Sequence, residues 1–286
     1  MYPAPFDYST PTTIDEAIHL LAEHGENAKV LAGGHSLLPL MKLRFAQPTH
    51  LVDLRRIPSL RGIRRDGTNL VIGAMTTYAE LAASGDVRDA APIIADAASQ
   101  IGDPQVRNRG TIGGSLAHAD PSADLPTVIL ALGATIIAAS ASGRRSIGAD
   151  AFFRELFTTS LDANEILAEI RVPISTARSG SAYAKHPHPA SRFALVGVAA
   201  TLDLERMGDR VQRVRVAVTG FANTPLRAIR VEEALVGRIA DADTIAVAAM
   251  ELDASPDTPD DSSGYKVQLA RVCADLALRR AAERAR

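Results

Sequence analysis

Two glycine-rich turns are the segments of this sequence whose residue types and spacing could do chemistry. The first is Gly33-Gly34-His35-Ser36, and the second, later in the chain, is the GTIGGS run of residues 110–115. Because glycine has no Cβ, such turns let several backbone N–H groups approach a ligand closely. Concave N–H arrays and helix N-termini bind anions, phosphates above all. The pair of turns therefore predicts a clamp for the two halves of a pyrophosphate, with hydroxyl donors added by Ser36, Thr111 and Ser115.

Two common nucleotide motifs do not fit these turns. A Walker A loop needs Lys-Ser or Lys-Thr after its last glycine, and a Rossmann fingerprint needs G-x-G-x-x-G within one turn. A single Gly-Gly turn is also typical of a tight connection that binds nothing. The second turn, however, lies in a segment dense in Gly, Pro, Asp and Asn, from Asp103 to Pro126, which we predict to be one long loop. Loops of that length inside a compact domain are usually functional or disordered, so the pair favours a binding site.

The first turn is positioned by a short segment of alternating strand and helix patterns. A helix is predicted over 12–25, where Thr13 and Glu16 have capping-box spacing. Strands are predicted over 28–32 and 50–54, with a short helix from about Leu37 between them.

The second turn is positioned by a longer α+β pattern. A hairpin over 60–74 turns at Asp66-Gly67, and Thr77 with Glu80 repeats the capping-box spacing. The remaining predicted helices of this part cover 77–84, 92–102 and 124–132, and its strands cover 134–140, 144–149 and 165–173.

A domain boundary is predicted at the polar, small-residue segment 174–182. After it, residues 194–205 and 211–221 read as paired strands, followed by helical patterns over 231–237, 243–252 and 266–285. Strands followed by helices predict that this C-terminal third is a small α+β unit.

Composition and charge exclude several classes of function. A formal net charge of -2 with scattered arginines argues against a nucleic-acid or anionic-membrane surface. No apolar run approaches the roughly 20 residues of a membrane-spanning helix. The N-terminus lacks the basic and apolar regions of a signal peptide, so we expect a cytoplasmic protein.

The single cysteine also limits the chemistry. Cys273 cannot form an intrachain disulfide or hold an iron–sulfur cluster alone, and its helical surroundings predict a buried core thiol. His186 and His188 have metal-ligand spacing, but no third ligand is evident. His35 and His118 are interpreted as shaping the two glycine loops or lying beside the bound ligand, not as general bases, and no catalytic triad or carboxylate pair stands out, so no catalytic side chain is assigned.

The chain resembles the FAD-binding medium subunit of the molybdenum hydroxylases, the xanthine dehydrogenase and carbon monoxide dehydrogenase group, and is most similar to the carbon monoxide dehydrogenase type. AGGHSLLPLMKLR (32–44) and RNRGTIGGSL (107–116) match its two signature loops, and similar segments run through nearly the whole chain. The resemblance implies that the chain is of the α+β class, with a two-lobed FAD-binding domain of the vanillyl-alcohol-oxidase/PCMH type over 1–177, whose lobes are about 1–55 and 56–177. It implies a small C-terminal domain, antiparallel sheet plus helices, over 178–286.

The resemblance assigns two sets of loop residues to FAD. They are Ala32, Gly33, Gly34, His35, Ser36 and Leu37 in the first loop, and Thr111, Ile112, Gly113, Gly114 and Ser115 in the second. Ser115 stands where many members of the family carry Asn, so a shorter hydroxyl replaces any amide contact there.

Four further residues are assigned by the same resemblance, each with a structural alternative. Asp124 matches an acidic residue that holds ribose or ribityl hydroxyls, but it is equally placed to be the N-cap of a helix. Ile101 fits an apolar contact to adenine, or core packing. Lys185 fits a position near the flavin, or a solvated strand end. Phe193 stands where close relatives carry Tyr, and can pack on the isoalloxazine without donating a hydrogen bond.

The function implied is that of an oxidoreductase subunit. FAD is held by this chain, while a large subunit carries the molybdopterin cofactor and a small subunit carries two [2Fe–2S] clusters, in a dimer of heterotrimers. Electrons pass from the clusters through FAD to an external acceptor. Two other functions stay open: a stand-alone flavin-dependent oxidoreductase on the same scaffold, and a non-catalytic nucleotide-binding subunit.

Overall fold

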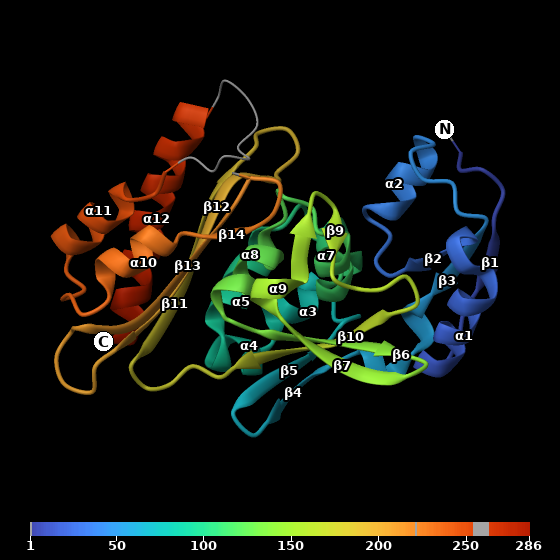
Figure 1. Ribbon diagram of the computed structural model, residues 1–286, viewed down its shortest axis with the longest axis horizontal. Helices are drawn as coiled ribbons and strands as arrows, with labels where there is room; N and C mark the ends of the chain where they lie inside the picture. The colour runs from blue at the N-terminus through green and yellow to red at the C-terminus, as the bar shows by residue number, and fades with distance from the viewer. Residues whose placement is uncertain (1, 221, 254–262) are drawn as a thin grey trace.

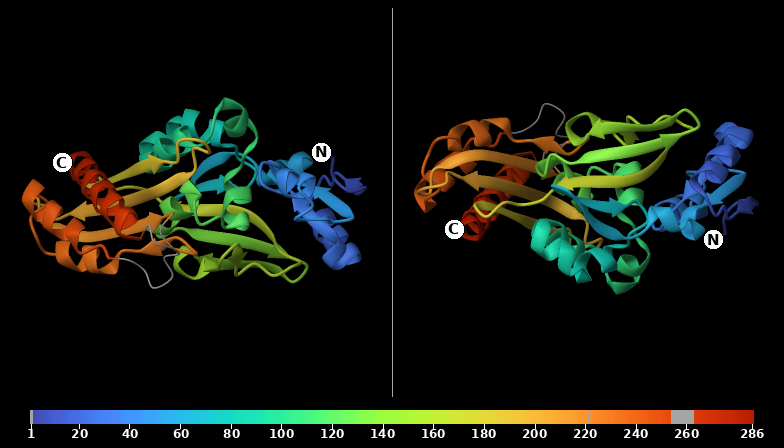
Figure 2. Two further views of the ribbon diagram at one scale, coloured as in Figure 1. Left: turned by 90° about the horizontal axis from the view of Figure 1, so that it is seen from above. Right: turned by 90° about the horizontal axis from the view of Figure 1, so that it is seen from below.

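The computed structural model describes residues 2–220, 222–253 and 263–286, and it has three parts in a row (Figure 1, Figure 2). A first lobe forms one end, a second lobe lies in the middle, and the C-terminal part forms the other end. Each part combines a sheet with helices, which confirms the predicted α+β class. The exact domain boundaries given above stay a prediction.

The first lobe is a parallel three-stranded sheet with two helices. In the sheet order its strands are β1 (Asp7–Ser9), β3 (His50–Asp53) and β2 (Ala28–Leu31), and its helices are α1 (Ile14–His24) and α2 (Leu37–Lys42). Thr13 caps α1 as predicted, because its hydroxyl accepts from the backbone N–H of Glu16. One-turn 3₁₀ helices lie at Gly25–Asn27, Leu54–Arg56 and Pro58–Leu60.

The second lobe is built on an antiparallel five-stranded sheet. In sheet order the strands are β4 (Ile63–Asp66), β5 (Asn69–Gly73), β10 (Ile166–Pro173), β6 (Thr135–Ser140) and β7 (Gly143–Gly148). The lobe also contains α3 (Tyr78–Ala83), α4 (Gly85–Ala90), α5 (Pro92–Gln100), α6 (Pro104–Arg109), α7 (Ile112–His118), α8 (Asp124–Ala131) and α9 (Ala149–Phe152), with the ribbon β8 (Phe153–Glu155) and β9 (Thr158–Thr159).

The two faces of this sheet bury different partners. Leu70, Ile136 and Ile170 pack with α5, α7 and α8 in the largest hydrophobic core. Ala139 and Ile166 pack instead with α1 of the first lobe. The sheet therefore joins the first lobe to the helices that carry the second glycine turn.

The C-terminal part is an antiparallel sheet between two layers of helix. Its strands in order are β11 (Ser179–Pro187), β12 (Ala194–Leu204), β13 (Val211–Thr219) and β14 (Leu226–Arg227), and its helices are α10 (Ile229–Leu235), α11 (Ala242–Met250) and α12 (Ser263–Ala285). The helix α12 packs on one face of β11 and β12, while α5 and α8 of the second lobe pack on the other face. Cys273 lies within α12 and is buried in the core of this part, as predicted.

One sequence prediction is wrong here. The segment from Asp103 to Pro126 is not one long loop, because Asp103 caps α6 and Thr111 caps α7, each by accepting from a backbone N–H. Residues 174–178 of the predicted boundary segment connect β10 to β11, and residues 179–182 begin β11, where the lack of a side chain on Gly180 allows α12 to pack closely. The predicted strand over 211–221 ends at Thr219, and Phe221 lies outside the described residues.

Other local predictions are confirmed, the hairpin with its turn one residue later. The predicted hairpin is formed by β4 and β5, but its two turn residues are Gly67 and Thr68 rather than Asp66 and Gly67, because Asp66 ends β4 and pairs with Asn69. Gly67 lies in the left-handed region at a φ of 57°. The capping box of Thr77 and Glu80 is complete at the start of α3. No helix in the described ranges is long and apolar enough to cross a membrane.

Candidate functional site

The two glycine turns, far apart in the sequence, meet in the structure. A Cβ on Gly33 would lie 2.3 Å from the carbonyl oxygen of Arg109, so only glycine fits where the first turn touches the residues before the second. A Cβ on Gly114 would lie 3.4 Å from the Cβ of Ala32. The β2–α2 connection and the start of α7 therefore form one surface, as the clamp hypothesis requires.

The first turn offers free hydrogen-bond donors. Among the described residues, none of the backbone N–H groups of residues 33–37 donates to another protein group. Ser36 is the N-cap residue of α2, but its hydroxyl makes no capping bond. Gly34 has a φ of 80°, a conformation that glycine adopts without strain. These donors at a helix start suit an anion.

The second turn uses most of its N–H groups internally. Ile112 donates to the carbonyl of Thr76, and Gly113 donates to the carbonyl of Ala74 at 2.8 Å. Gly114 donates to the hydroxyl of Thr111. The prediction of a second free N–H array is therefore wrong: residues 110–115 instead form a wall beside the first turn, and this wall includes the side chains of Thr111 and Ser115.

Tyr78, which sequence reasoning missed, holds this wall in place. Its backbone N–H donates to the carbonyl of Gly110, and its ring fills the space that a Cβ on Gly110 would take. Burial raises the pKa of Tyr78 to about 12; the Ser115 hydroxyl opposes this rise and the charge of Asp124 adds to it. The phenol therefore stays protonated near the second turn and near Asp124.

Asp124 is a buried carboxylate rather than a helix cap. The N-cap of α8 is Ala123, and Asp124 follows it in the first turn with 3% of its surface exposed. Its carboxylate accepts from the phenol of Tyr183 at 2.6 Å and from Nζ of Lys185 at 3.0 Å. Burial raises the pKa of Asp124, and the charge of Lys185 and both hydrogen bonds oppose that rise.

Lys185 is not the solvated strand end that was the alternative. Its side chain is 2% exposed, and it comes from β11 of the C-terminal part, whereas Asp124 comes from the second lobe. Tyr183 lies two residues before it on the same strand and so faces the same side of the sheet. The structure thus places Asp124 and Lys185 together, and adds a tyrosine that no local pattern had indicated.

Ile101 and Phe193 lie in neighbouring segments. Ile101 follows α5 and packs against the main core, which agrees with the core-packing alternative. Phe193 is 47% exposed in the β11–β12 loop, and Arg192 of that loop donates to the carbonyl of Gly102. The Phe193 ring is therefore available to a ligand on this side of the second lobe.

The two histidines of the glycine segments are in different surroundings. His35 is exposed in the first turn. His118, at the end of α7, packs against the ring of Phe157 with centroids 5.2 Å apart, and burial lowers its pKa. The environment of His118 favours the neutral imidazole.

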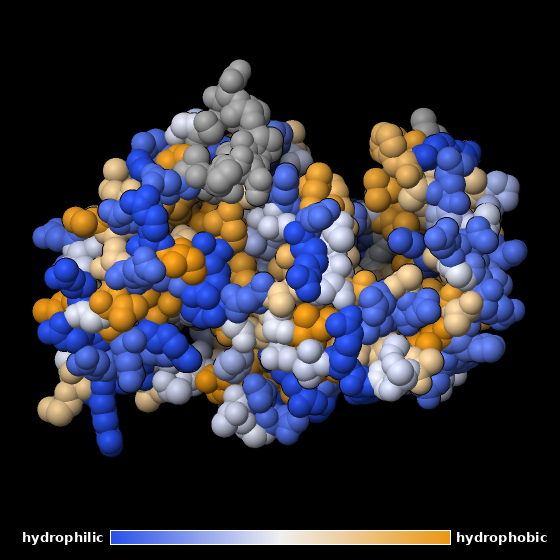
Figure 3. Space-filling view, in the orientation of Figure 1, coloured by the Kyte–Doolittle hydropathy of each residue, from blue (hydrophilic) through white to orange (hydrophobic). Residues whose placement is uncertain are grey.

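The surface is hollowed between the first lobe and the middle of the molecule. Figure 3 shows this cleft on the side where α2 faces α7 in Figure 1. Since the first turn leads into α2 and the second into α7, both turns belong to its walls.

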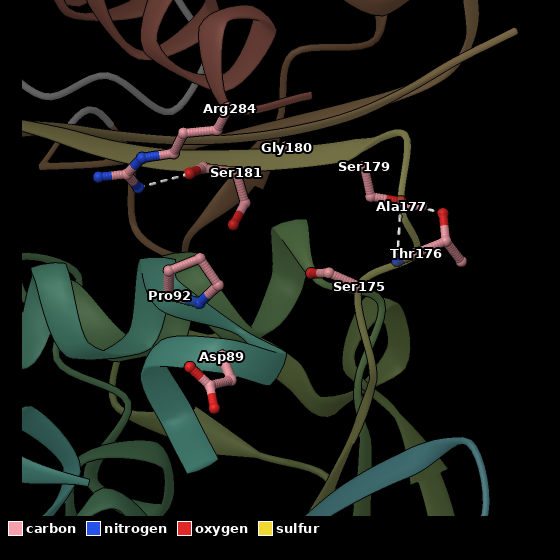
Figure 4. Close-up of a pocket in the computed structure, with 9 residues that line it drawn as sticks. All are labelled: Asp89, Pro92, Ser175, Thr176, Ala177, Ser179, Gly180, Ser181 and Arg284. Carbon is pink, nitrogen blue, oxygen red and sulfur yellow. Dashed lines mark hydrogen bonds between the residues drawn. The ribbon is translucent and has the colours of Figure 1, made fainter. Parts of the chain in front are cut away.

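A separate cavity of about 430 Å³ lies between the α4–α5 segment of the second lobe and the start of β11 in the C-terminal part (Figure 4). Two of its hydroxyls are paired, since Thr176 contacts Ser179 and Ser179 donates to Asp203, whereas the buried hydroxyl of Ser181 has no hydrogen-bond partner among the described residues. The Arg284 guanidinium, which also lines it, donates to Asp96 and to the carbonyl of Ser181. This cavity lacks a glycine turn with free N–H groups, so it is not the nucleotide candidate.

Two family models together match most of the chain. Residues 4–175 match the FAD binding domain in molybdopterin dehydrogenase, and residues 181–281 match the CO dehydrogenase flavoprotein C-terminal domain.

Relatives match over nearly the full length. The chain is 42% identical to the carbon monoxide dehydrogenase medium chain of Hydrogenophaga pseudoflava over 94% of each protein. It is 38% identical to the 6-hydroxypseudooxynicotine dehydrogenase complex subunit alpha of Paenarthrobacter nicotinovorans, covering 100% of this chain and 97% of that one. Among solved structures, a chain of the Hydrogenophaga pseudoflava carbon monoxide dehydrogenase superposes with a TM-score of 0.94 at 43% identity, covering 99% of each.

Proposed function

The chain belongs to the family of FAD-binding medium subunits of the molybdenum hydroxylases, which are oxidoreductases, and we propose that it is the electron-transfer subunit of such an enzyme. In this role it receives electrons from the [2Fe–2S] clusters of a small subunit and delivers them to an external acceptor. Bound FAD supplies the redox chemistry, because no side chain of the described residues is arranged for it.

The observation that carries the proposal is the free N–H array of residues 33–37 beside the second turn. The pyrophosphate would be held by these N–H groups, by the Ser36 hydroxyl and by the hydroxyls of Thr111 and Ser115. Thr111 accepts from Gly114 through its oxygen, so its own hydrogen is still available for donation. These backbone N–H and hydroxyl donors are uncharged, and together they would replace the water molecules that bind the anion in solution.

The other assigned residues would hold the remainder of the cofactor. Asp124 would accept from ribose or ribityl hydroxyls, since a carboxylate has more acceptor positions than its present partners occupy. Ile101 would contact the adenine through its exposed edge. Lys185 would keep Asp124 ionised, and Phe193 would pack on the isoalloxazine and exclude water from it.

The proposed partners follow from the division of redox centres. The named relatives include medium chains and subunits of dehydrogenase complexes. The only cysteine of this chain is Cys273, so iron–sulfur clusters must be on another chain. We propose a large molybdopterin-binding subunit and a small [2Fe–2S] subunit, assembled as a dimer of heterotrimers.

The test is the flavin content of the chain after co-production with its large and small subunits and desalting. Wild type should retain the flavin absorption bands. Gly33→Ala should lose them, because the added Cβ would meet the carbonyl of Arg109 at 2.3 Å and separate the two turns. Gly148→Ala is the matched control, since a Cβ there meets nothing within 4 Å, and it should keep FAD.

A second variant separates ligand contact from packing. Ser36→Ala removes one uncommitted hydroxyl and introduces no clash, so we expect FAD affinity to fall by about tenfold. Wild type that carries no flavin in the assembled complex would overturn the proposed function. Flavin reduced by a small substrate in the isolated chain would favour the stand-alone oxidoreductase instead.

A further inference from the structure

The buried phenol of Tyr183 is not used by any step described so far. It is 2% exposed, and it donates to Oδ1 of Asp124 at 2.6 Å. Lys185 contacts both oxygens of the same carboxylate, Oδ1 at 2.9 Å and Oδ2 at 3.0 Å. Since Tyr183 and Lys185 are both on β11, one strand of the C-terminal part supplies both donors to a carboxylate of the second lobe.

The position of the phenol is set by the neighbouring strand. A Cβ on Gly197 of β12 would lie 2.2 Å from the Tyr183 hydroxyl oxygen and 2.9 Å from Cγ2 of Thr219. The phenol therefore occupies the space that a side chain at residue 197 would need. Burial and the charge of Asp124 raise the pKa of Tyr183 well above its ordinary value, so the hydroxyl remains a donor.

The two donors together restrict the carboxylate more than either does alone. Lys185 is a point charge that can follow a rotating carboxylate, whereas the Tyr183 hydroxyl is directional and acts on one oxygen. A carboxylate has about four acceptor positions, so capacity remains, mainly on Oδ2.

We propose that Tyr183 is a positioning residue of the FAD site: it holds the Asp124 carboxylate in one orientation, so that Oδ2 keeps an acceptor position for a hydroxyl group of the cofactor. The inference rests on the proposed function, because it assumes that Asp124 contacts FAD. Its consequence is that the C-terminal part contributes to cofactor affinity through a residue that does not touch the cofactor.

The groups that face Asp124 determine how FAD affinity depends on pH when the Tyr183 hydroxyl is removed. Lys185 and Tyr183 face it from β11, and Tyr78 lies near it from α3. In Tyr183→Phe, one of the hydrogen bonds that favour the ionised carboxylate is removed, so the pKa of Asp124 rises. When the solution is acidified, FAD affinity should therefore begin to fall at a higher pH in Tyr183→Phe than in wild type.

The experiment measures FAD binding by flavin fluorescence in the assembled complex, after FAD has been removed and added back. Tyr183→Phe should bind FAD about tenfold more weakly at pH 7.5, and its affinity should decline further at pH 5.5 than that of wild type. The matched control is Tyr8→Phe, because Tyr8 donates to Asp53 at 2.5 Å beside Arg55 in the first lobe. That variant should bind FAD as wild type does.

A second variant tests the geometry without removing the hydroxyl. Gly197→Ala should displace the phenol and weaken FAD binding in the wild-type background, but should add little to Tyr183→Phe. Equal affinity and equal pH dependence of Tyr183→Phe and wild type would overturn the positioning role, as would full additivity of the two substitutions. A wild-type complex that does not take up FAD overturns the proposed function instead.

Discussion

Replacing Lys185 by Met should strongly destabilise the FAD-free chain. The side chains of Asp124 and Lys185 are 4% and 2% exposed, so the substitution leaves a buried carboxylate without its cation. Removing one partner of a buried ion pair costs about 3–5 kcal/mol, which corresponds to a fall in Tm of roughly 6–20 °C for a domain of this size. Met fills a similar volume, so the loss reports the charge rather than a cavity.

The pH dependence gives the prediction a specific signature. An isolated Asp has a pKa of about 3.9, which approximates the unfolded chain, while burial raises the pKa of Asp124 in the folded state. Removing Lys185 raises it further. Stability is therefore lost as pH rises from the unfolded-state pKa of Asp124 through its folded-state pKa. The loss of unfolding free energy in Lys185→Met relative to wild type should consequently be larger at pH 8 than at pH 5.

Denaturant unfolding of the 286-residue chain at these two pH values measures both effects. The double variant Asp124→Asn with Lys185→Met should recover part of the loss, because no buried charge remains. A loss below about 1 kcal/mol, with the same deficit at both pH values, would refute the reasoning that the ion pair offsets the burial of Asp124.

Two further predictions concern parts outside the cofactor site. His50 stacks on His24 with ring centroids 3.8 Å apart, and burial, together with the neighbouring His24, lowers the pKa of His50. The chain should therefore lose stability as pH falls below about 6.5, the ordinary pKa of histidine. In unfolding experiments at pH 7.5 and 5.5, His50→Gln should weaken that pH dependence. Asp150 of the second lobe pairs with Arg215 at 2.8 Å and with Arg227 at 3.5 Å in the C-terminal part, but its side chain is 53% exposed; Asp150→Ala should cost only about 0.5–1 kcal/mol in thermal unfolding and leave FAD binding unchanged.

Elements whose stabilising contacts are local in sequence could be predicted. The caps at Thr13 and Thr77 and the hairpin that turns at Gly67 and Thr68, one residue later than predicted, depend on residues close in sequence, so their spacing is visible in the sequence. The α6 and α7 helices were missed although Asp103 and Thr111 cap them, because glycine and proline within short segments normally argue against helix. Their stability comes from tertiary contacts, such as the bond from Gly113 to Ala74.

The candidate site was predictable only in part, for a related reason. The glycine turns and Asp124 were identified from residue type and from family resemblance. The partner of Asp124 lies on another part of the chain, 61 residues away, and Tyr183 lies 59 residues away. No local period or spacing encodes such a pair, and strand β11 itself was not predicted. A buried hydrogen-bond network of this kind becomes visible only when the sheet and α8 are packed together.

Glycine is required for different physical reasons at different positions of the two turns, so substitutions at these positions test different properties. Gly33 and Gly113 are required by packing, because a Cβ would meet the carbonyl of Arg109 in one case and the backbone of Ala74 in the other. Gly34 is required by its backbone conformation, at a φ of 80° beside the free N–H groups. Loss of FAD in a Gly113 variant would therefore report that the wall has moved. Loss in a Ser36 variant, where no backbone must shift, reports the contact with the cofactor itself.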